Sequence, residues 1–301
     1  MKTTKMMYTL LLAVISLYSF AQNTQNPELK QQIDHILLNK KADVGVSIIG
    51  SGKNGNIQIN GNKMYPMLSA VKFPIALAVL DKVQKGELAM NQPLFIKKEE
   101  LLDNPENWSP FKEKFPEGNV TITLEEALSW MVSYSDNNLT DILLRLIGGP
   151  ETVQRYINSK YFSIKNDEED MHKDWESQFI NQITPNEAVA LLKKLDDGKL
   201  LNKTYTTWLY TAMVNNQSGA KRLKAQLPKG VKIAHRTGTS FTNAEGMTGA
   251  INDYGSIELP NNRKIYIAVF VHNTYESFPD SEKIIADISK AAFDYYTQKS
   301  K

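Results

Sequence analysis

The chain has 301 residues, of which 42% are hydrophobic, 9% aromatic and 23% charged, and none is cysteine. This composition predicts a globular protein of one large or two modest domains. It excludes a disulfide framework, a thiolate zinc site, an iron–sulfur cluster and a cysteine nucleophile. Once Lys2 and Lys5 of the N-terminal segment are set aside, basic and acidic residues balance, so no positive excess remains to bind nucleic acid.

The first 21 residues are typical of a secretory signal peptide. Lys2 and Lys5 are followed by the almost wholly apolar segment 6–20, with small residues at Ser19 and Ala21. About 15 apolar residues are fewer than the roughly 20 that a membrane-spanning helix needs, although an N-terminal anchor is the alternative. No cysteine follows that could carry a lipid. We therefore expect cleavage after Ala21 and a periplasmic mature protein without membrane attachment.

The first elements of the mature chain alternate between helix and strand patterns. Residues 26–38 have apolar positions spaced for one face of a helix, and 44–49 and 57–59 read as a strand and its returning partner. The apolar run 73–80 predicts a buried helix. A Pro-rich loop is expected over 103–118.

Helices dominate the middle of the chain. Thr123 and Glu126 form a capping box that opens a helix running to about residue 134. A second helix is expected over 138–147, stopped by two glycines and a proline. A second capping box at Thr184 opens a helix that ends near Leu195.

Strand patterns return towards the C-terminus, over 231–234, 249–259 and 264–272, and an amphipathic helix is expected over 281–296. Strands thus lie at both ends of the chain and helices in the middle. These patterns predict one mixed domain built from both ends of the chain, with an all-helical domain inserted between them.

The expected domain limits follow from this distribution. Residues 22–62 together with 216–301 would form the mixed α/β domain, and 63–215 the inserted helical domain.

Ser69 and Lys72 are spaced as a nucleophile and its base would be on one face of a helix. A serine at a helix start also lies near free backbone N–H groups, which can stabilise an oxyanion. Two other Ser-x-x-Lys segments, 109–112 and 218–221, lie in connections that contain Pro, Asn or Gly. Taken alone, the pair at 69 and 72 fits a helix cap with a surface lysine better than a catalytic pair.

Two further polar motifs accompany this pair. Ser135-Asp136-Asn137 lies between two expected helices, where it could pass a proton and hold an amide, or be an ordinary turn. The segment 235–240, His-Arg-Thr-Gly-Thr-Ser, lies on and just after the strand expected to begin at residue 231. Its glycine permits close approach of a ligand, and its Arg and Thr side chains could hold a carboxylate. The alternative is an edge strand with a polar end.

The three motifs occur in the order found in class A β-lactamases and penicillin-binding proteins. The sequence resembles a class A serine β-lactamase over essentially the whole mature chain. The resemblance implies the α+β fold of serine β-lactamases and penicillin-binding proteins. In this fold an antiparallel sheet is flanked by terminal helices, an all-α domain is inserted, and the active site lies between the two domains.

Departures from the common pattern resemble the PER- and VEB-like branch of extended-spectrum cephalosporinases. His172 stands where most relatives have Asn, and Asn181 stands where many have Asp. The alignment makes Glu168 the residue that resembles the deacylation base, and Glu169 is its rival because the acidic run 167–170 permits a shift of register.

Two arginines complete the resemblance to this branch. Arg236 replaces the usual Lys before Thr-Gly. This replacement keeps the positive charge but changes its geometry, so we expect an altered substrate preference. Arg222 matches an arginine that helps to hold the substrate carboxylate, although a surface helix charge is the alternative.

The resemblance implies acyl transfer in two steps. Ser69 attacks the lactam carbonyl, and Lys72 or Glu168, the latter through a water, accepts its proton. The backbone N–H groups of Ser69 and Thr239 form the oxyanion hole, Ser135 relays a proton to the lactam nitrogen, and Glu168 activates the water for deacylation. The residues implied to contact the substrate are Asn137, His172, Arg222, Arg236, Thr237, Gly238, Thr239 and Ser240.

We therefore expect an enzyme that hydrolyses penicillins and cephalosporins, with a leaning towards cephalosporins, and so confers antibiotic resistance. No metal, organic cofactor or nucleic acid is expected, and the protein is expected to be a monomer. Two alternatives are a penicillin-binding D-Ala-D-Ala peptidase, which lacks the deacylating Glu, and a non-catalytic envelope binding protein that keeps the fold.

Overall fold

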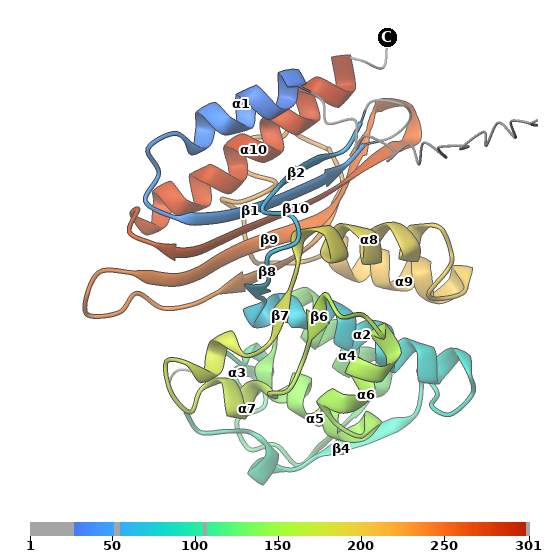
Figure 1. Cartoon of the computed structure of the whole chain (residues 1–301). Helices are drawn as coiled ribbons and strands as arrows, with labels where there is room; N and C mark the ends of the chain where they lie inside the picture. The colour runs from blue at the N-terminus through green and yellow to red at the C-terminus, as the bar shows by residue number, and fades with distance from the viewer. Residues whose placement is uncertain (1–26, 51–54, 105–106, 299–301) are drawn as a thin grey trace, which may run out of the picture.

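The computed structural model describes residues 27–50, 55–104 and 107–298, and the predicted signal peptide lies outside them. A five-stranded antiparallel sheet in the order β2-β1-β10-β9-β8 forms its centre (Figure 1). Its strands are β1 Asp43–Ile49, β2 Ile57–Ile59, β8 Ile233–Thr239, β9 Thr248–Leu259 and β10 Arg263–Thr274.

Two terminal helices, α1 (Pro27–Leu37) and α10 (Phe278–Gln298), pack side by side over one face of this sheet (Figure 1). Leu29 and Ile33 of α1 and Ile285 and Ile288 of α10 are fully buried there, in one apolar cluster with the inward side chains of the strands. The predicted α+β fold with an antiparallel sheet flanked by terminal helices is confirmed.

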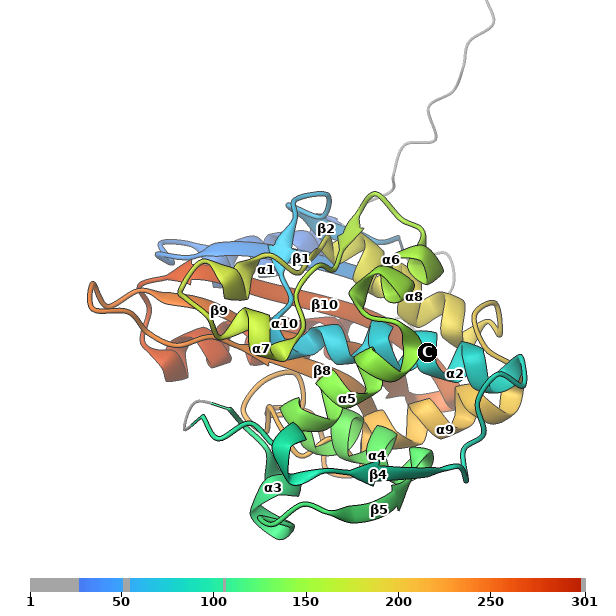
Figure 2. The ribbon, with the colours of Figure 1, turned by 90° about the horizontal axis from the view of Figure 1, so that it is seen from below.

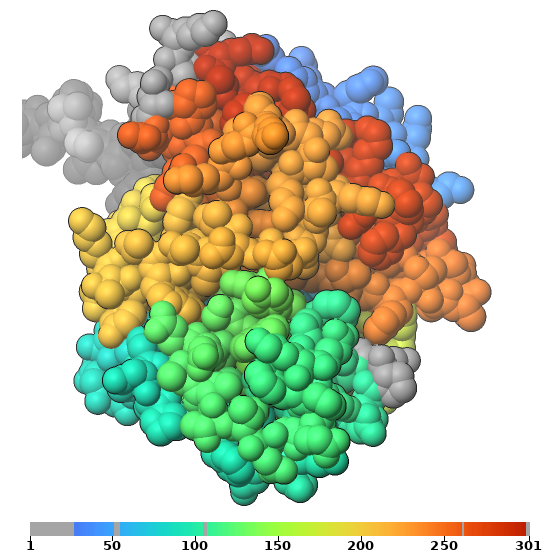
Figure 3. Space-filling model, turned by 180° about the vertical axis from the view of Figure 1, so that it is seen from behind, coloured from blue at the N-terminus to red at the C-terminus, as the bar shows by residue number. Residues whose placement is uncertain are grey.

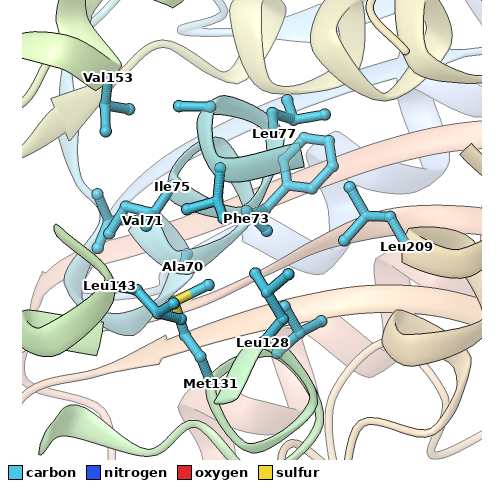
Figure 4. Packing of buried hydrophobic residues seen from close by; sticks show 14 of the residues in the cluster. Ala70, Val71, Phe73, Ile75, Leu77, Leu128, Met131, Leu143, Val153 and Leu209 are labelled. Atoms are coloured by element: carbon cyan, nitrogen blue, oxygen red, sulfur yellow. The ribbon is translucent and has the colours of Figure 1, made fainter. Parts of the chain in front are cut away.

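The second hydrophobic cluster lies on the opposite face of the sheet and is centred on α2 (Lys72–Gln84). Figure 2 shows α2 running through the helical part with α5 beside it, and Figure 4 shows Phe73 and Leu77 of α2 among side chains from several other helices. These helices are α4 Leu124–Tyr134, α5 Asn137–Ile147, α6 Pro150–Ile157, α8 Pro185–Asp196 and α9 Lys203–Val214.

The helical part and the sheet are in direct contact. Helices α8 and α9 both pack on the sheet, and Figure 3 shows the yellow and orange surface of α9 and the following segment lying against the green helical surface. Within the described ranges, no helix is long and apolar enough to cross a membrane.

Shorter elements connect these parts and surround the site. The 3-10 helices are η1 Leu68–Val71, η2 Lys98–Glu100, η3 Ser177–Phe179 and η4 Pro260–Asn262. The short helices are α3 Pro110–Lys114 and α7 Glu168–Met171. The short strands are β3 Tyr65–Pro66, β4 Pro93–Ile96, β5 Val120–Thr123, β6 Phe162–Ser163 and β7 Gln182–Ile183.

The two predicted capping boxes differ in outcome. At Thr123 both reciprocal bonds are present, so this prediction is confirmed. At Thr184 the hydroxyl accepts the Glu187 N–H at 3.1 Å, but the Thr184 N–H donates to the Tyr161 carbonyl at 3.0 Å. The prediction of a full box there is wrong because a tertiary contact already uses the donor that Glu187 would have capped.

Candidate active site

Ser69 lies on η1, a single turn that leads directly into α2. The preceding Leu68 has φ +49°, a left-handed conformation that costs energy for a residue with a side chain. Tertiary hydrogen bonds hold the turn on both sides. Met67 N–H donates to the Asn181 carbonyl at 2.8 Å, and the Tyr254 hydroxyl donates to the Ala70 carbonyl at 2.8 Å. The strain around Ser69 is thus supported by its surroundings.

Lys72 lies at the first position of α2 and is completely buried. Its Nζ donates to Ser69 Oγ at 2.8 Å and to Asn137 Oδ1 at 2.7 Å, and it forms an ion pair with the Glu168 carboxylate. These three partners use all three ammonium protons. Burial lowers the pKa of Lys72, whereas the charge of Glu168 opposes this effect. Lys72 is therefore an ammonium group that can release a proton more readily than an exposed lysine.

Glu168 begins α7 and is only 2% exposed, whereas Glu169 is exposed to solvent. Asp141 fixes the start of this helix, because its two carboxylate oxygens accept the N–H groups of Glu168 and Glu169 at 2.7 and 3.1 Å. Burial, followed by the nearby charge of Glu168, raises the pKa of Asp141 to about 8. Of the two rival glutamates, the structure places Glu168 beside Lys72.

Asn181 and His172 shape the same loop. The completely buried Asn181 accepts the N–H groups of Lys165 and Asn166 at 2.8 and 3.0 Å, so its amide closes the loop without a charge. His172 Nδ1 lies 2.5 Å from the Glu168 carbonyl oxygen, which can only accept, so this nitrogen carries a proton.

Ser135 follows α4 in the left-handed conformation, with φ 61°. Its Oγ accepts a hydrogen bond from Arg236 Nη2 at 3.0 Å, which leaves the serine proton available to another acceptor. The same guanidinium also donates to the Ser69 carbonyl at 3.3 Å. Arg236 is completely buried, and burial lowers its pKa to about 10, so it remains a cation at neutral pH.

The end of β8 lies against η1. A Cβ on Gly238 would come within 2.0 Å of the Met67 carbonyl oxygen, so only glycine permits this approach. Thr239 is exposed at the strand end, whereas Ser240 donates to Gln178 Oε1 at 2.7 Å and ties β8 to η3.

Arg222 lies behind this strand, 3% exposed. It donates to the Gly238 and Asn252 carbonyls at 2.9 Å each and to Thr239 Oγ1 at 2.7 Å, and pairs with Glu282 at 3.2 Å. The alternative of a surface charge at this position is wrong, because the side chain is buried and surrounded by oxygen atoms that accept its hydrogen bonds. Arg222 does not line the cavity described next.

A cavity of about 1710 Å³ opens between β8, α3, α5 and α7. Eight of the predicted site residues line it, namely Ser69, Ser135, Asn137, Glu168, His172, Thr237, Thr239 and Ser240. The others, Lys72, Arg222, Arg236 and Gly238, lie behind its wall.

Several residues at the site were missed by the sequence analysis. Trp108, Trp175 and Phe241 line the cavity as aromatic groups, and Ser218 adds a hydroxyl. Trp108 and Phe241 are more than half exposed. Aromatic residues within polar loops are a signal that could have pointed to them.

Comparison with known proteins identifies the family of this chain. The β-lactamase enzyme family matches residues 28–296. The chain is 42% identical to β-lactamase VEB-1 of Pseudomonas aeruginosa over 98% of this chain and 100% of that protein. It is 35% identical to extended-spectrum β-lactamase PER-1 of Pseudomonas aeruginosa, over 96% and 94% of the two chains. The crystal structure of TLA-1 extended-spectrum β-lactamase covers 90% of this chain and 99% of its own, with 44% identity and a TM-score of 0.87. The chain therefore belongs to the β-lactamase enzyme family, as a class A serine β-lactamase of the VEB- and PER-like branch.

Proposed function

We propose that this β-lactamase works through a Ser69 acyl-enzyme that is hydrolysed with the help of Glu168. The observation that carries the proposal is the position of Lys72, whose Nζ contacts Ser69 Oγ, Asn137 Oδ1 and the Glu168 carboxylate at once. A serine nucleophile needs a base within hydrogen-bond reach, and a base needs a place to send its proton. Lys72 meets both requirements.

In acylation, Lys72 passes a proton to Glu168 and takes the proton of Ser69 as the hydroxyl attacks the lactam carbonyl. Burial of Lys72, which lowers its pKa, favours this transfer. The backbone N–H groups of Ser69 and Thr239 stabilise the oxyanion, and one such donor is typically worth about 3–4 kcal/mol of barrier. The contact between Gly238 and Met67 supports this pairing because it holds β8 against η1.

The leaving lactam nitrogen needs a proton, which Ser135 supplies. Its Oγ already accepts from Arg236, so its own proton is free to point into the cavity. Ser135 recovers its proton from Lys72, and Glu168 returns its proton to Lys72, so Glu168 is a carboxylate again when the acyl-enzyme has formed. In deacylation Glu168 takes a proton from water as the water attacks the acyl carbonyl, and this proton passes to Ser69 Oγ as the acyl bond breaks. The exposed Glu169 has no comparable access to Lys72.

Substrate recognition divides between the cavity wall and the groups behind it. We assign the substrate carboxylate to the hydroxyls of Thr237 and Thr239, with Ser240 alongside, and the side-chain amide to Asn137 and the loop of His172. Gly238 permits the close approach of this wall to η1. Arg236 and Arg222 act through Ser135 and Thr239 respectively, because both arginines are buried.

We also propose a leaning towards cephalosporins, including bulky oxyimino compounds. The relatives PER-1 and TLA-1 are named extended-spectrum enzymes, and the cavity of about 1710 Å³ leaves room for large side chains. Comparing kcat/KM for benzylpenicillin, cephalothin and cefotaxime tests this leaning, and negligible cefotaxime turnover would contradict it.

Export to the periplasm, cleavage after Ala21 and a monomeric state belong to the same proposal. They rest on the composition of residues 1–21 and on the small-molecule substrate. The division into a mixed domain, 22–62 with 216–301, and a helical domain, 63–215, also remains a proposal. It is supported by the five-stranded sheet, whose strands all come from the two outer segments.

Rapid-mixing kinetics with a chromogenic cephalosporin test the division of roles. Glu168→Gln is expected to release one equivalent of product in a burst and then stall. Without the Glu168 charge, buried Lys72 loses its proton more readily and can still take the Ser69 proton, whereas deacylation has lost its base. The neighbouring Glu169→Gln is the matched control and should turn over like wild type. A burst in the Glu169 variant instead would move the base to that residue.

A further inference from the structure

A chain of buried polar groups runs behind β8, from Asp253 on β9 through His235 on β8 to Asn216. All three are at most 3% exposed. His235 Nδ1 lies 2.9 and 3.0 Å from the two Asp253 oxygens, and its Nε2 lies 3.4 Å from Asn216 Nδ2. Asn216 in turn contacts Arg236, one of the groups assigned to the reaction above. The chain therefore connects a buried histidine to the active site.

The surrounding donors fix the orientation of the Asn216 amide. Its Oδ1 accepts from Arg236 Nη1 at 3.2 Å and from Ser218 N–H and Oγ at 3.2 and 2.8 Å. A guanidinium and a backbone amide can only donate, so the amide oxygen must face them. The amide NH₂ group is then left facing the ring of His235.

This orientation determines the protonation state of His235. Because Asn216 presents N–H donors, His235 Nε2 must be an acceptor and carry no proton. The single ring proton then lies on Nδ1, where the Asp253 carboxylate accepts it. Asp253 is held in turn by the Leu223 N–H at 3.2 Å. The contacts thus specify a neutral imidazole protonated at Nδ1.

We propose that His235, held by Asp253, is a positioning residue for β-lactam hydrolysis. Its neutral form fixes the Asn216 amide, whose oxygen holds the Arg236 guanidinium in the place from which it donates to Ser135. The inference rests on the roles proposed above for Arg236 and Ser135.

Protonation of His235 breaks this arrangement. A proton on Nε2 would face the Asn216 NH₂ group, two donors opposing each other, and the amide would have to turn. Its NH₂ group would then oppose Arg236 Nη1 and the Ser218 N–H, so Arg236 would lose an acceptor. A proton on Nε2 of His235 is therefore expected to slow hydrolysis.

The charged groups around His235 come from the elements packed on it. On β8, β9 and the segment after α9 they are Arg236, Asp253, Arg222 and Lys224. Helix α9 also packs on β8, but its one charged residue, Lys203, lies at the end farther from Asn216. Asp253 is the carboxylate in direct contact with the ring, and it accepts at Nδ1 whether or not Nε2 is protonated.

The protonation state is measured directly by long-range ¹⁵N–¹H correlation of the histidine rings in the full chain labelled at histidine. The chain has four histidines, and His235→Gln identifies the signals of this one. At neutral pH we expect wild-type His235 to be neutral with its proton on Nδ1. In Asn216→Asp we expect both nitrogens to be protonated, because a carboxylate would accept from Nε2. A wild-type imidazolium, or a proton on Nε2, would overturn the inference.

Kinetics of two Asn216 variants separate positioning from mere structural support. Asn216→Leu keeps the size but removes the acceptor, and kcat/KM is expected to fall by about ten- to a hundredfold, mostly in kcat. Asn216→Asp restores the acceptor and should recover kcat/KM. In this variant the dependence of kcat/KM on pH should no longer follow the ring signals of His235. Equal losses in both variants, or none in either, would refute a role through the amide oxygen.

Arg236→Ala distinguishes this inference from the proposed function. If it hydrolyses cephalosporins as fast as wild type, the proposed role of Arg236 itself is wrong. If Arg236→Ala is impaired while Asn216→Leu is not, the proposed function stands and the positioning by His235 and Asn216 is refuted.

Discussion

Replacement of the buried Arg222 by alanine tests whether this residue touches substrate or supports the strand that does. Its side chain is 4% exposed, pairs with Glu282 at 3.2 Å and donates to the Gly238 and Asn252 carbonyls and to Thr239 Oγ1. Removing one partner of a buried ion pair typically costs about 3–5 kcal/mol, because the remaining charge is left uncompensated. Two carbonyls would also lose their donor.

For a chain of this size, such a loss lowers Tm by about 10 °C. Loss of the Thr239 contact should also reduce kcat/KM by about tenfold, because misplacement of a positioned group slows the reaction. Arg155→Ala is the control, since that arginine is 69% exposed in an ion pair with Glu151 and should leave Tm nearly unchanged. Tm is measured by differential scanning calorimetry of both variants beside wild type. If Arg222→Ala kept the wild-type Tm and lost only substrate affinity, the side chain would contact the substrate directly, and the reasoning from burial would be refuted.

Other predictions concern the walls of the site. In Gly238→Ala, the new Cβ would meet the Met67 carbonyl oxygen, so both Tm and kcat/KM should fall, and a fully active, equally stable variant would contradict the fit of β8 against η1. The pKa of Asp141 is raised from 3.8 to about 8. Between these pH values Asp141 binds a proton in the folded protein more fully than in the unfolded chain. Its contribution therefore makes the free energy of unfolding decrease as pH rises. Chemical denaturation of wild type and Asp141→Asn between about pH 5 and about pH 8 should therefore show a steeper decrease for wild type, and parallel curves would contradict the raised pKa. Asn181→Ala should lower activity more than its effect on Tm explains, because the loop that carries Glu168 loses its closing hydrogen bonds, and activity that follows Tm alone would refute this role.

The main architecture was predictable because its signals are local. Apolar spacing and capping residues placed α1, α4, α5, α8 and α10 within a few residues of their observed ends. Strand β8 differs from the predicted strand in its bounds. Its predicted part, 231–234, ends where the polar residues begin, but the observed strand runs from Ile233 to Thr239. Pairing with β9 supplies the hydrogen bonds, and side chains such as Arg236 find buried partners that composition alone does not reveal.

Helix α9 was not predicted at all. Its sequence contains several threonines and aromatic residues, which have weak intrinsic helix propensity. Its burial against α4 and β8 compensates for that weakness, and such tertiary contacts have no local signal.

The site was predicted in its residue types more fully than in its geometry. Motif order identified Ser69, Lys72 and Ser135, but not that Arg236 reaches the Ser135 hydroxyl or that Arg222 lies behind Thr239. The choice between the two neighbouring glutamates also depends on burial. It follows from the way Asp141 orients α7, a contact between distant parts of the chain.

The most direct test of the proposed mechanism is intact-mass analysis of the mature protein during reaction with cefotaxime, followed by peptide mapping, with Glu168→Gln beside wild type. We expect wild type to return to its free mass as substrate is consumed. Glu168→Gln should accumulate one acyl adduct, located on Ser69. A wild type that remains permanently acylated, an adduct on another residue, or turnover by Ser69→Ala would contradict the mechanism.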